Sequence, residues 1–269
     1  VKRIEDEVYY CWMPSQETEQ KAITLEKFKK MDIDIIISSI PAHDIAFAKL
    51  IRDYKPKARH ISQIGNLWGE TPVKNVMCSF PMTRATIRPD QNVVFYNQEF
   101  DLNTFCYNPP STNKIISSFI HWLPRQELFN QYKKLLPEFT FKSFGAGCVD
   151  GCLILRDMAR EMQNSMFAWH IKPHGDGFGH VLHNWLASGR PLITTLSDYQ
   201  HRSNRLIDGE TWIYLEHNSP AKNSELIREW SEPTKHRKVC ENVYKVFREN
   251  VDFTKDADEI IKFLDKVMV

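Results

Sequence analysis

The chain has 269 residues, of which 42% are hydrophobic, and its formal net charge is +1. This composition supports a packed core and excludes a disordered chain, while the near-neutral charge excludes a global field that attracts nucleic acid or membranes. The length suits two modest domains or one large one. No apolar run is long enough to span a membrane and no signal peptide is visible, so we expect a cytoplasmic protein.

The six cysteines include no C-x-x-C pair. Disulfides are unusual in proteins that are not exported. We therefore expect the cysteines to be reduced and buried.

The N-terminal half alternates between strand and helix patterns. Residues 31–40 form an apolar, isoleucine-rich run that predicts a strand buried on both faces. Strands that alternate with helices indicate a parallel α/β sheet. The other predicted elements of this half are a helix at 44–54 and strands at 57–64, 74–80 and 92–96.

A second α/β unit begins near residue 112. Its final part, 232–269, predicts two helices separated by residues 252–255, with Asp256 as the N-cap of the last helix and Glu259 as its capping-box partner. The preceding elements are strands at 114–120, 139–144, 166–171 and 192–195 and helices at 124–135, 152–164 and from 180 to about Gly189.

A proline-rich polar segment separates the two units. Residues 108–113, Asn-Pro-Pro-Ser-Thr-Asn, are the best linker candidate. We therefore place one domain at residues 1–110 and the second at 111–269. The predicted fold is α/β, with two Rossmann-like domains facing a cleft, and ligands bind such sheets at the carboxyl ends of the strands.

The run from Lys172 to Ile193 is the most informative stretch of the chain. Gly175, Gly177 and Gly179 give the loop backbone freedom and let another group approach closely. A glycine loop that leads into a helix N-terminus is an anion site, because free N–H groups and the helix dipole both point at the ligand.

Three polar side chains are spaced four residues apart in this run. Asp176, His180 and Asn184 can therefore lie on one side and bind hydroxyl groups. Lys172 precedes the loop, where its charge can reach a phosphate. The pattern predicts a phosphate cradle beside hydroxyl-binding side chains.

The same run resembles the nucleotide-sugar site of glycosyltransferases with the GT-B fold, above all the retaining family that includes glycogen synthase and sucrose synthase. Residues 176–179, Asp-Gly-Phe-Gly, match the family's Glu-Gly-Phe-Gly, and 187–193, Ala-Ser-Gly-Arg-Pro-Leu-Ile, match its Ala-Ser-Gly-x-Pro-Val-Ile. The family's second acid is replaced by Asn184. The resemblance covers most of 92–269, and the last two helices resemble a pair that usually crosses back to the first domain.

The resemblance implies roles for residues in both domains. Asp176 is implied to hydrogen-bond the donor sugar, Asn184 to contact the ribose and His43 to lie on the acceptor side, so that Asp176 and His43 are the catalytic candidates. The implied donor-binding residues are Lys172, Gly175, Gly177, Phe178, Gly179, His180, Asn184, Arg125 and Gly145.

The implied reaction moves a sugar from a nucleotide-diphosphate sugar to an acceptor hydroxyl, with retention and without a cofactor or an essential metal. The acceptor stays open between a glycan, a lipid, a small molecule and a modified nucleic-acid base. The acceptor-side domain at 1–110 is short, so we expect either a minimal fold or a preceding segment or second chain that completes it.

The sequence also bears on other functions. A nucleotide-sugar epimerase of the same fold needs carboxylates around the sugar, and Asn184 counts against it, whereas a non-catalytic nucleotide-sugar-binding subunit tolerates that residue. The glycines at 145–151 miss the dinucleotide fingerprint by one position, which disfavours a nicotinamide enzyme. The histidines at 170, 174, 180 and 183 include no H-E-x-x-H motif, so no metal site is predicted.

Overall fold

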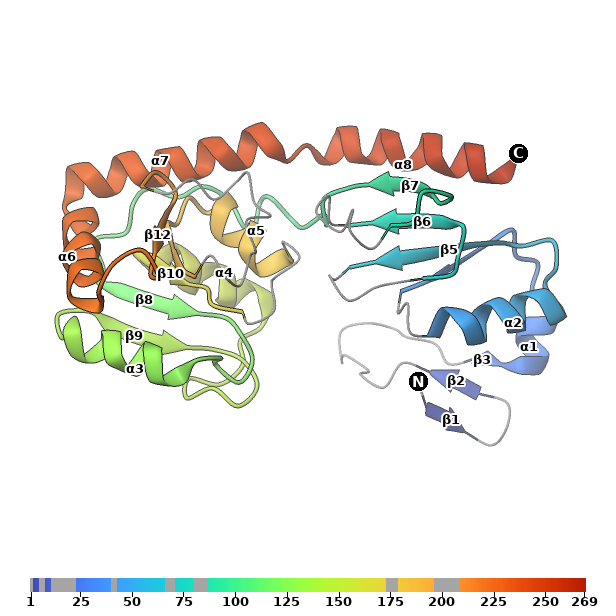
Figure 1. Cartoon of the computed structure of the whole chain (residues 1–269), viewed down its shortest axis with the longest axis horizontal. Coiled ribbons are helices and arrows are strands. Elements are labelled where there is room, and N and C mark those ends of the chain that lie inside the picture. The colour runs from blue at the N-terminus through green and yellow to red at the C-terminus, as the bar shows by residue number, and fades with distance from the viewer. Residues whose placement is uncertain are drawn as a thin grey trace.

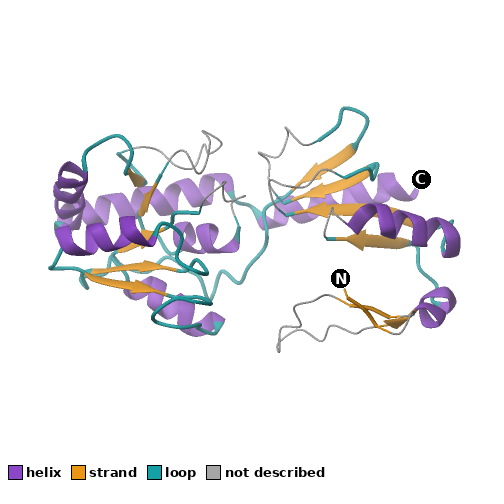
Figure 2. Cartoon of the chain, turned by 60° about the horizontal axis from the view of Figure 1, so that its bottom comes forward, coloured by secondary structure: helices purple, strands orange, loops and turns teal. Residues whose placement is uncertain are grey.

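The computed structural model of the chain describes residues 2–4, 8–10, 23–39, 43–65, 71–79, 87–172, 179–195 and 209–269. These residues form two lobes, each built around a parallel β-sheet (Figure 1). One loop joins the lobes, and the last two helices run along both of them (Figure 2). The element order confirms the predicted α/β class with two sheets.

The sheet of the N-terminal lobe consists of four parallel strands, which in spatial order are β4 (Ile35–Ser38), β5 (Arg59–Ile64), β6 (Asn75–Cys78) and β7 (Asn92–Phe95). Helix α2 (Asp44–Tyr54) lies on one face, where its first residue accepts hydrogen bonds from strand serines. On the opposite face, Ile61 of β5 packs with Phe263 of α8 (Phe253–Met268). The C-terminal helix thus completes the core of the N-terminal lobe.

A small antiparallel sheet precedes this lobe and was not predicted from the sequence. It is formed by β1 (Lys2–Ile4), β2 (Val8–Tyr10) and β3 (Ile23–Thr24), and it lies to one side of the four-stranded sheet (Figure 2). Helix α1 (Leu25–Lys30) follows directly, and Thr24 caps it by accepting a hydrogen bond from the amide of Lys27 at 3.1 Å. The N-terminal lobe therefore contains more secondary structure than the predicted strands and helix.

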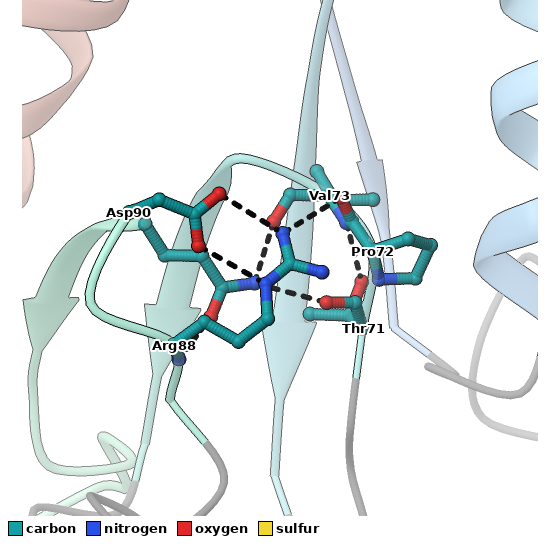
Figure 3. A network of polar contacts seen from close by, with 6 residues as sticks. Thr71, Pro72, Val73, Arg88 and Asp90 are labelled. Atoms are coloured by element: carbon teal, nitrogen blue, oxygen red, sulfur yellow. Dashed lines mark hydrogen bonds and ion pairs between the residues drawn. The ribbon is translucent and has the colours of Figure 1, made fainter.

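Two connections of the N-terminal lobe are tied together by polar contacts (Figure 3). The Gln91 side chain donates to the carbonyl oxygens of Thr71 and Val73 at 2.9 and 2.7 Å. Arg88 donates to the carbonyl oxygen of Pro72 at 3.3 Å and pairs with Asp90 at 3.1 Å. The turn before β7 thus holds the segment before β6 in place.

The C-terminal lobe has a five-stranded parallel sheet in the order β12-β11-β10-β8-β9. The chain reverses direction along the sheet at β8, which lies between β9 and β10, and this switch point is where open α/β sheets bind ligands. The elements are β8 (Ile115–Ser118), α3 (Gln126–Leu135), β9 (Thr140–Ser143), α4 (Leu155–Asn164), β10 (Phe167–Trp169), α5 (His180–Ala187), β11 (Leu192–Thr194), β12 (Trp212–Tyr214), α6 (Pro220–Ser231) and α7 (Pro233–Asn250).

The observed strands are shorter than the predicted ones, and β12 and α6 were not predicted. Helix α2 occupies the predicted residues 44–54, whereas α4 begins at Leu155 rather than at 152. Strand β12 consists of three buried residues, Trp212–Tyr214, beyond which Ser219 caps α6. A three-residue strand is too short to produce a periodic pattern in the sequence.

The predicted N-cap of the last helix is wrong. Helix α8 begins at Phe253, and Asp252 caps it by accepting hydrogen bonds from the amides of Thr254 and Lys255, both at 3.1 Å. Asp256 instead accepts two hydrogen bonds from Asn97, one from the backbone amide at 3.0 Å and one from the side-chain amide at 2.7 Å. The carboxylate that resembled a cap therefore ties α8 to the residues that follow β7.

We expect Asp256→Ala to destabilise the docking of α8 on the N-terminal lobe by about 1–2 kcal/mol, because two hydrogen bonds to one carboxylate are lost. Hydrogen exchange of the Asn97 amide measures this local opening. Asp258→Ala, at an exposed position of the same helix, is the matched control. Equal exchange rates in the two variants would contradict the assigned role of Asp256.

The loop between the lobes is anchored by a fully buried arginine. Nη1 of Arg190 donates to the carbonyl oxygens of Asn108 at 3.2 Å and Ser188 at 3.1 Å. Nη2 donates to the carbonyl oxygens of Pro109 at 3.1 Å and Gln163 at 2.8 Å. The guanidinium therefore joins the predicted linker segment to the ends of α4 and α5.

The surroundings of Arg190 are closely packed. A Cβ atom on Gly189 would lie 2.6 Å from the Tyr107 ring, and Gly189 has a φ of +68°. Burial raises the pKa of the Cys240 thiol to about 12, and burial together with the Arg190 charge lowers the pKa of His236 to about 4. Both groups are therefore uncharged at neutral pH, so neither neutralises the charge of Arg190.

The five cysteines among the described residues are reduced, as predicted, but only some are buried. Cys78 and Cys240 lie in the core, Cys148 is partly buried, and Cys106 and Cys152 are exposed on loops. The expectation of uniformly buried thiols is therefore wrong. None of the helices in the described part of the chain is long and apolar enough to cross a membrane.

Candidate functional site

The carboxyl ends of the two sheets face each other across the space between the lobes. In Figure 1, the arrows of β8 and β9 point toward the N-terminal lobe, and those of β5, β6 and β7 point toward the C-terminal lobe. Parallel α/β sheets bind ligands outside the carboxyl ends of their strands. The side chains that follow these strands are therefore the candidates for a functional site.

The glycine loop connects β10 to α5 at this edge of the C-terminal sheet. Its predicted residues Gly175, Asp176, Gly177 and Phe178 lie outside the described residues. The flanking residues are described: Lys172 is partly buried after β10, and Gly179 is the N-cap of α5 with extended backbone. The structure thus places the two ends of the predicted loop at the expected edge of the sheet.

Helix α5 is held rigidly by its apolar face. Leu182, Trp185 and Leu186 are fully buried, and the helix packs against α7. The N-cap residue Gly179 has no side chain with which to cap α5, while its carbonyl oxygen accepts hydrogen bonds from the amides of Leu182 and His183 at 3.1 and 3.3 Å. The N-terminus of α5 lies at the carboxyl edge of the sheet, where the helix dipole favours an anionic group.

The two polar positions predicted on α5 have different surroundings. His180 is exposed in the first turn. Asn184, one turn later, is 1% exposed, and its Oδ1 atom has no hydrogen-bond partner within the described part of the protein. A buried amide oxygen without a donor costs free energy, so Asn184 is suited to accept a hydrogen bond from a ligand hydroxyl.

The other predicted donor-side residues lie on the loops after β8 and β9. Gly145 follows β9 with a φ of +131°, and a Cβ atom there would lie 3.0 Å from Nδ1 of His121. The Ala146 amide donates to that same Nδ1 at 2.8 Å, and the Trp122 amide donates to the Ala146 carbonyl oxygen at 2.7 Å. These two hydrogen bonds hold the loops together, and Gly145 permits their close approach.

Arg125 stands at the N-cap of α3 in a left-handed conformation with φ 54°. Trp122 and Leu123 also have positive φ values, 63° and 34°. Side chains other than glycine avoid this region because Cβ approaches the backbone, and such strain gathers at functional sites. The loop after β8 is therefore strained at three of four consecutive residues.

The buried hydroxyl of Ser118 ends β8 beneath this loop. Its Oγ atom has no hydrogen-bond partner among the residues that the structure describes. The adjacent Phe119 ring stacks on Phe144 at 5.0 Å and contacts Trp185 of α5 at 5.4 Å. An aromatic layer thus fixes the loops after β8 and β9 relative to α5.

On the N-terminal lobe, His43 immediately precedes α2. Its Nδ1 atom is buried and lacks a hydrogen-bond partner in the described ranges. The next residue, Asp44, is fully buried and accepts hydrogen bonds from Ser38 at 2.5 Å, Ser62 at 2.6 Å and Thr71. His43 is thus held at the carboxyl end of β4 by a buried polar network.

The network continues to His60, whose Nε2 atom lies 2.9 Å from Oγ of Ser38. Ser38 donates its proton to Asp44, so its oxygen accepts a hydrogen bond from Nε2–H of His60. Burial lowers the pKa of His60 more than the Asp44 carboxylate raises it. His60 faces a pocket of about 320 Å³ that lies beside α2 and the start of β6.

The structure therefore brings the described donor-side residues to one edge of the C-terminal sheet. Lys172, Gly179, His180 and Asn184 follow β10, Arg125 follows β8 and Gly145 follows β9. His43 lies at the matching edge of the other sheet. Sequence reasoning missed Trp122, although a tryptophan directly after a predicted strand end was a signal.

Within the described ranges, no three His, Cys, Asp or Glu side chains gather closely enough to hold an ion.

No protein-family model matches the chain, and no curated protein matches it. Solved structures are similar in fold. Anabaena HepE in complex with UDP-glucose aligns with a TM-score of 0.71 at 10% identity, over 90% of this chain and 80% of that one. Sucrose-phosphate synthase from Thermosynechococcus elongatus aligns with a TM-score of 0.71 at 12% identity, over 90% of this chain and 77% of that one.

A glycosyltransferase from Rickettsia africae aligns with a TM-score of 0.68 at 13% identity, over 91% of this chain and 79% of that one. Each of these alignments covers about nine-tenths of the chain, so the similarity spans both lobes. The two facing parallel sheets and these neighbours identify the fold of the chain as the GT-B fold of glycosyltransferases.

Proposed function

We propose that the protein is a glycosyltransferase that moves a sugar from a nucleotide-diphosphate sugar to an acceptor hydroxyl. The observation that carries this proposal is the position of α5. Its N-terminus follows the predicted glycine loop at the carboxyl edge of the C-terminal sheet, within a GT-B fold. Some structures of similar fold contain UDP, UDP and glucose, or UDP-glucose, which favours a donor of this class.

The donor diphosphate needs hydrogen-bond donors and positive charge. The amides at the start of α5 and the glycine loop supply the former, and Lys172 and Arg125 supply the latter. These groups also stabilise the nucleotide diphosphate as it leaves, which is where negative charge develops in the transition state. Gly145 keeps the neighbouring loop close, because a side chain there would press on His121.

The ribose of the donor is assigned to Asn184. A ribose hydroxyl donates to its buried Oδ1 atom and so supplies the partner that the described residues do not provide. His180 lies one turn earlier, nearer the phosphates, where a neutral imidazole hydrogen-bonds and an imidazolium pairs with an anion. Asp176 is assigned to the hydroxyls of the transferred sugar on sequence grounds.

The acceptor is assigned to the N-terminal lobe. His43 is positioned there by Asp44 and its hydroxyl partners, and its buried Nδ1 atom is suited to contact a hydroxyl group. The proposed reaction is a hexosyl transfer that retains the anomeric configuration, with a donor phosphate oxygen accepting the proton of the acceptor. This scheme requires neither a metal ion nor a side-chain base.

A non-catalytic nucleotide-sugar-binding role is the second candidate. The observation that favours it is Asn184, an uncharged residue at the position of the family's second acid. Binding without turnover distinguishes this role from transfer, and interconversion of sugars distinguishes an epimerase from both.

We expect uridine diphosphate or another nucleoside diphosphate, or the corresponding nucleotide-diphosphate sugar, to raise the melting temperature of the full chain. Ligand at a hundred times its dissociation constant stabilises a protein by about 2.7 kcal/mol, which is a shift of several degrees.

Asp176→Ala is expected to lower slow hydrolysis of the bound sugar nucleotide by about 100-fold or more, measured by mass spectrometry. The proposal fails if no nucleotide stabilises the protein and Asp176→Ala changes nothing.

A further inference from the structure

Trp122 is a large apolar side chain that the donor site does not use. It lies in the loop after β8 and is 75% exposed. Tryptophan is usually well buried because of its large apolar surface, so a largely exposed ring needs an explanation. Its loop lies at the edge of the C-terminal sheet that faces the N-terminal lobe (Figure 1).

The backbone conformation of this loop is energetically unfavourable. Trp122, Leu123 and Arg125 adopt left-handed conformations with φ values of 63°, 34° and 54°. A left-handed conformation costs roughly 1–2 kcal/mol for a residue with a Cβ atom, and it persists only where the surroundings enforce it. Leu123 is buried and anchors the loop, while Trp122 before it points out of the core.

The adjacent turn enforces the conformation. The Trp122 amide donates to the Ala146 carbonyl oxygen at 2.7 Å, and the Ala146 amide donates to the His121 ring at 2.8 Å. The six-membered ring of Trp122 packs on Gly147, where a Cβ atom would lie 2.1 Å from Cε3. The indole is therefore held against a glycine, and most of its surface faces outward.

We propose that Trp122 is a stacking platform for a sugar ring of the acceptor, so that the acceptor of the proposed transferase is a glycoside or a free sugar. The inference rests on the proposed function. A rigid, flat aromatic ring matches the apolar face of a pyranose, whose hydroxyl groups point sideways toward polar neighbours.

The ribose contact assigned above belongs to α5, and the phosphate contacts belong to α5, to Lys172 after β10 and to Arg125. Trp122 precedes Arg125 by three residues in the loop after β8, the neighbouring strand of β10, so it lies beside the proposed donor site. The loop that carries Trp122 follows the carboxyl end of β8, whose arrow points toward the lobe that carries His43 (Figure 1). A sugar ring on Trp122 therefore lies on the side from which the acceptor hydroxyl must arrive.

The test uses the full chain and the sugar nucleotide that it hydrolyses. Transfer to methyl α- and β-glucoside, methyl α- and β-galactoside, maltose and cellobiose is measured by mass spectrometry. Glycerol and a serine-containing peptide are the acceptors without a sugar ring. Trp122→Ala is expected to raise the KM for the sugar acceptor about tenfold, a size typical of one aromatic stacking contact. Trp122→Phe keeps most of the affinity, and both variants keep donor hydrolysis within twofold.

A second pair of variants tests the positioning of the ring. Gly147→Ala is expected to raise the acceptor KM as Trp122→Ala does, because the new Cβ atom displaces the indole. Gly151→Ala is the matched control, since Gly151 has the same φ of +73° with no atom within 4 Å of a Cβ. It should leave the acceptor KM unchanged.

Three results would contradict the inference, and they are distinguishable. Trp122→Ala lowering donor hydrolysis as strongly as transfer overturns the inference and assigns the ring to the donor. Hydrolysis by the unaltered protein with no transfer to any sugar, or an unchanged KM in Trp122→Ala, overturns it while the proposed function stands. Absence of both nucleotide binding and hydrolysis overturns the proposed function and the inference with it.

Discussion

Replacing Arg190 with methionine is expected to lower the free energy of unfolding by about 3–5 kcal/mol. Methionine fills most of the volume but leaves the carbonyl oxygens of Asn108, Pro109 and Gln163 without their donor. These oxygens belong to backbone carbonyl groups, so they remain in the interior of the variant without a hydrogen-bond donor. The removed desolvation cost of the guanidinium offsets part of the loss, which keeps the estimate below the sum of the lost hydrogen bonds.

Urea denaturation measures the effect on Arg190→Met, with Arg190→Lys as the control that keeps the charge. A lysine ammonium cannot reproduce the two arms of the guanidinium, so we expect Lys to recover only part of the stability. Limited proteolysis provides a local readout, because loss of the anchor should expose residues 108–113 to cleavage. A Met variant as stable as the unaltered protein would show that Arg190 does not anchor the loop.

Asp44→Ala is expected to destabilise the N-terminal lobe by a similar amount, about 3–5 kcal/mol. The carboxylate is fully buried and accepts hydrogen bonds from the hydroxyls of Ser38, Ser62 and Thr71. Alanine leaves these donors without an acceptor and creates a cavity. The position at the first turn of α2 adds to the loss, because a negative charge there is favoured by the helix dipole.

Asp44→Asn and Asp53→Ala complete this experiment. Asparagine keeps the shape but replaces one acceptor oxygen with a donor, so we expect an intermediate loss. Asp53 is in the last turns of the same helix, partly exposed, and its removal should change stability by less than about 0.5 kcal/mol. If Asp44→Ala matched Asp53→Ala in thermal denaturation, the buried network would not be a stabilising element.

The same residues explain why parts of the fold were predictable. Helix α2 could be located from the sequence because the change from a strand pattern to a helix pattern is visible within a few residues. In the structure this helix occupies residues 44–54. The interlobe loop was recognisable from its prolines. In contrast, Asp256 resembled a helix cap, because an acid followed three residues later by Glu259 is the cap pattern. Its partner Asn97 is far away in the sequence, so no local pattern reveals the contact.

The candidate site divides in the same way. Glycines and an acid before a helix are a local signal, and they pointed to the loop before α5. The orphaned oxygen of Asn184 and the exposed ring of Trp122 have no such signal. Burial and exposure depend on which elements pack above a residue, and sequence periodicity does not specify that for a single position.

By itself, the sequence determined the α/β class, because strand and helix patterns depend on hydrophobic periodicity within a few neighbouring residues. The linker and the glycine loop are predictions from turn chemistry, which is equally local. Only the tertiary structure decided that α8 completes the N-terminal lobe, that Arg190 anchors the linker and that the Trp122 ring is exposed. These features depend on contacts between residues far apart in the chain. Such contacts form only when packing brings the elements together, so local propensity cannot encode them.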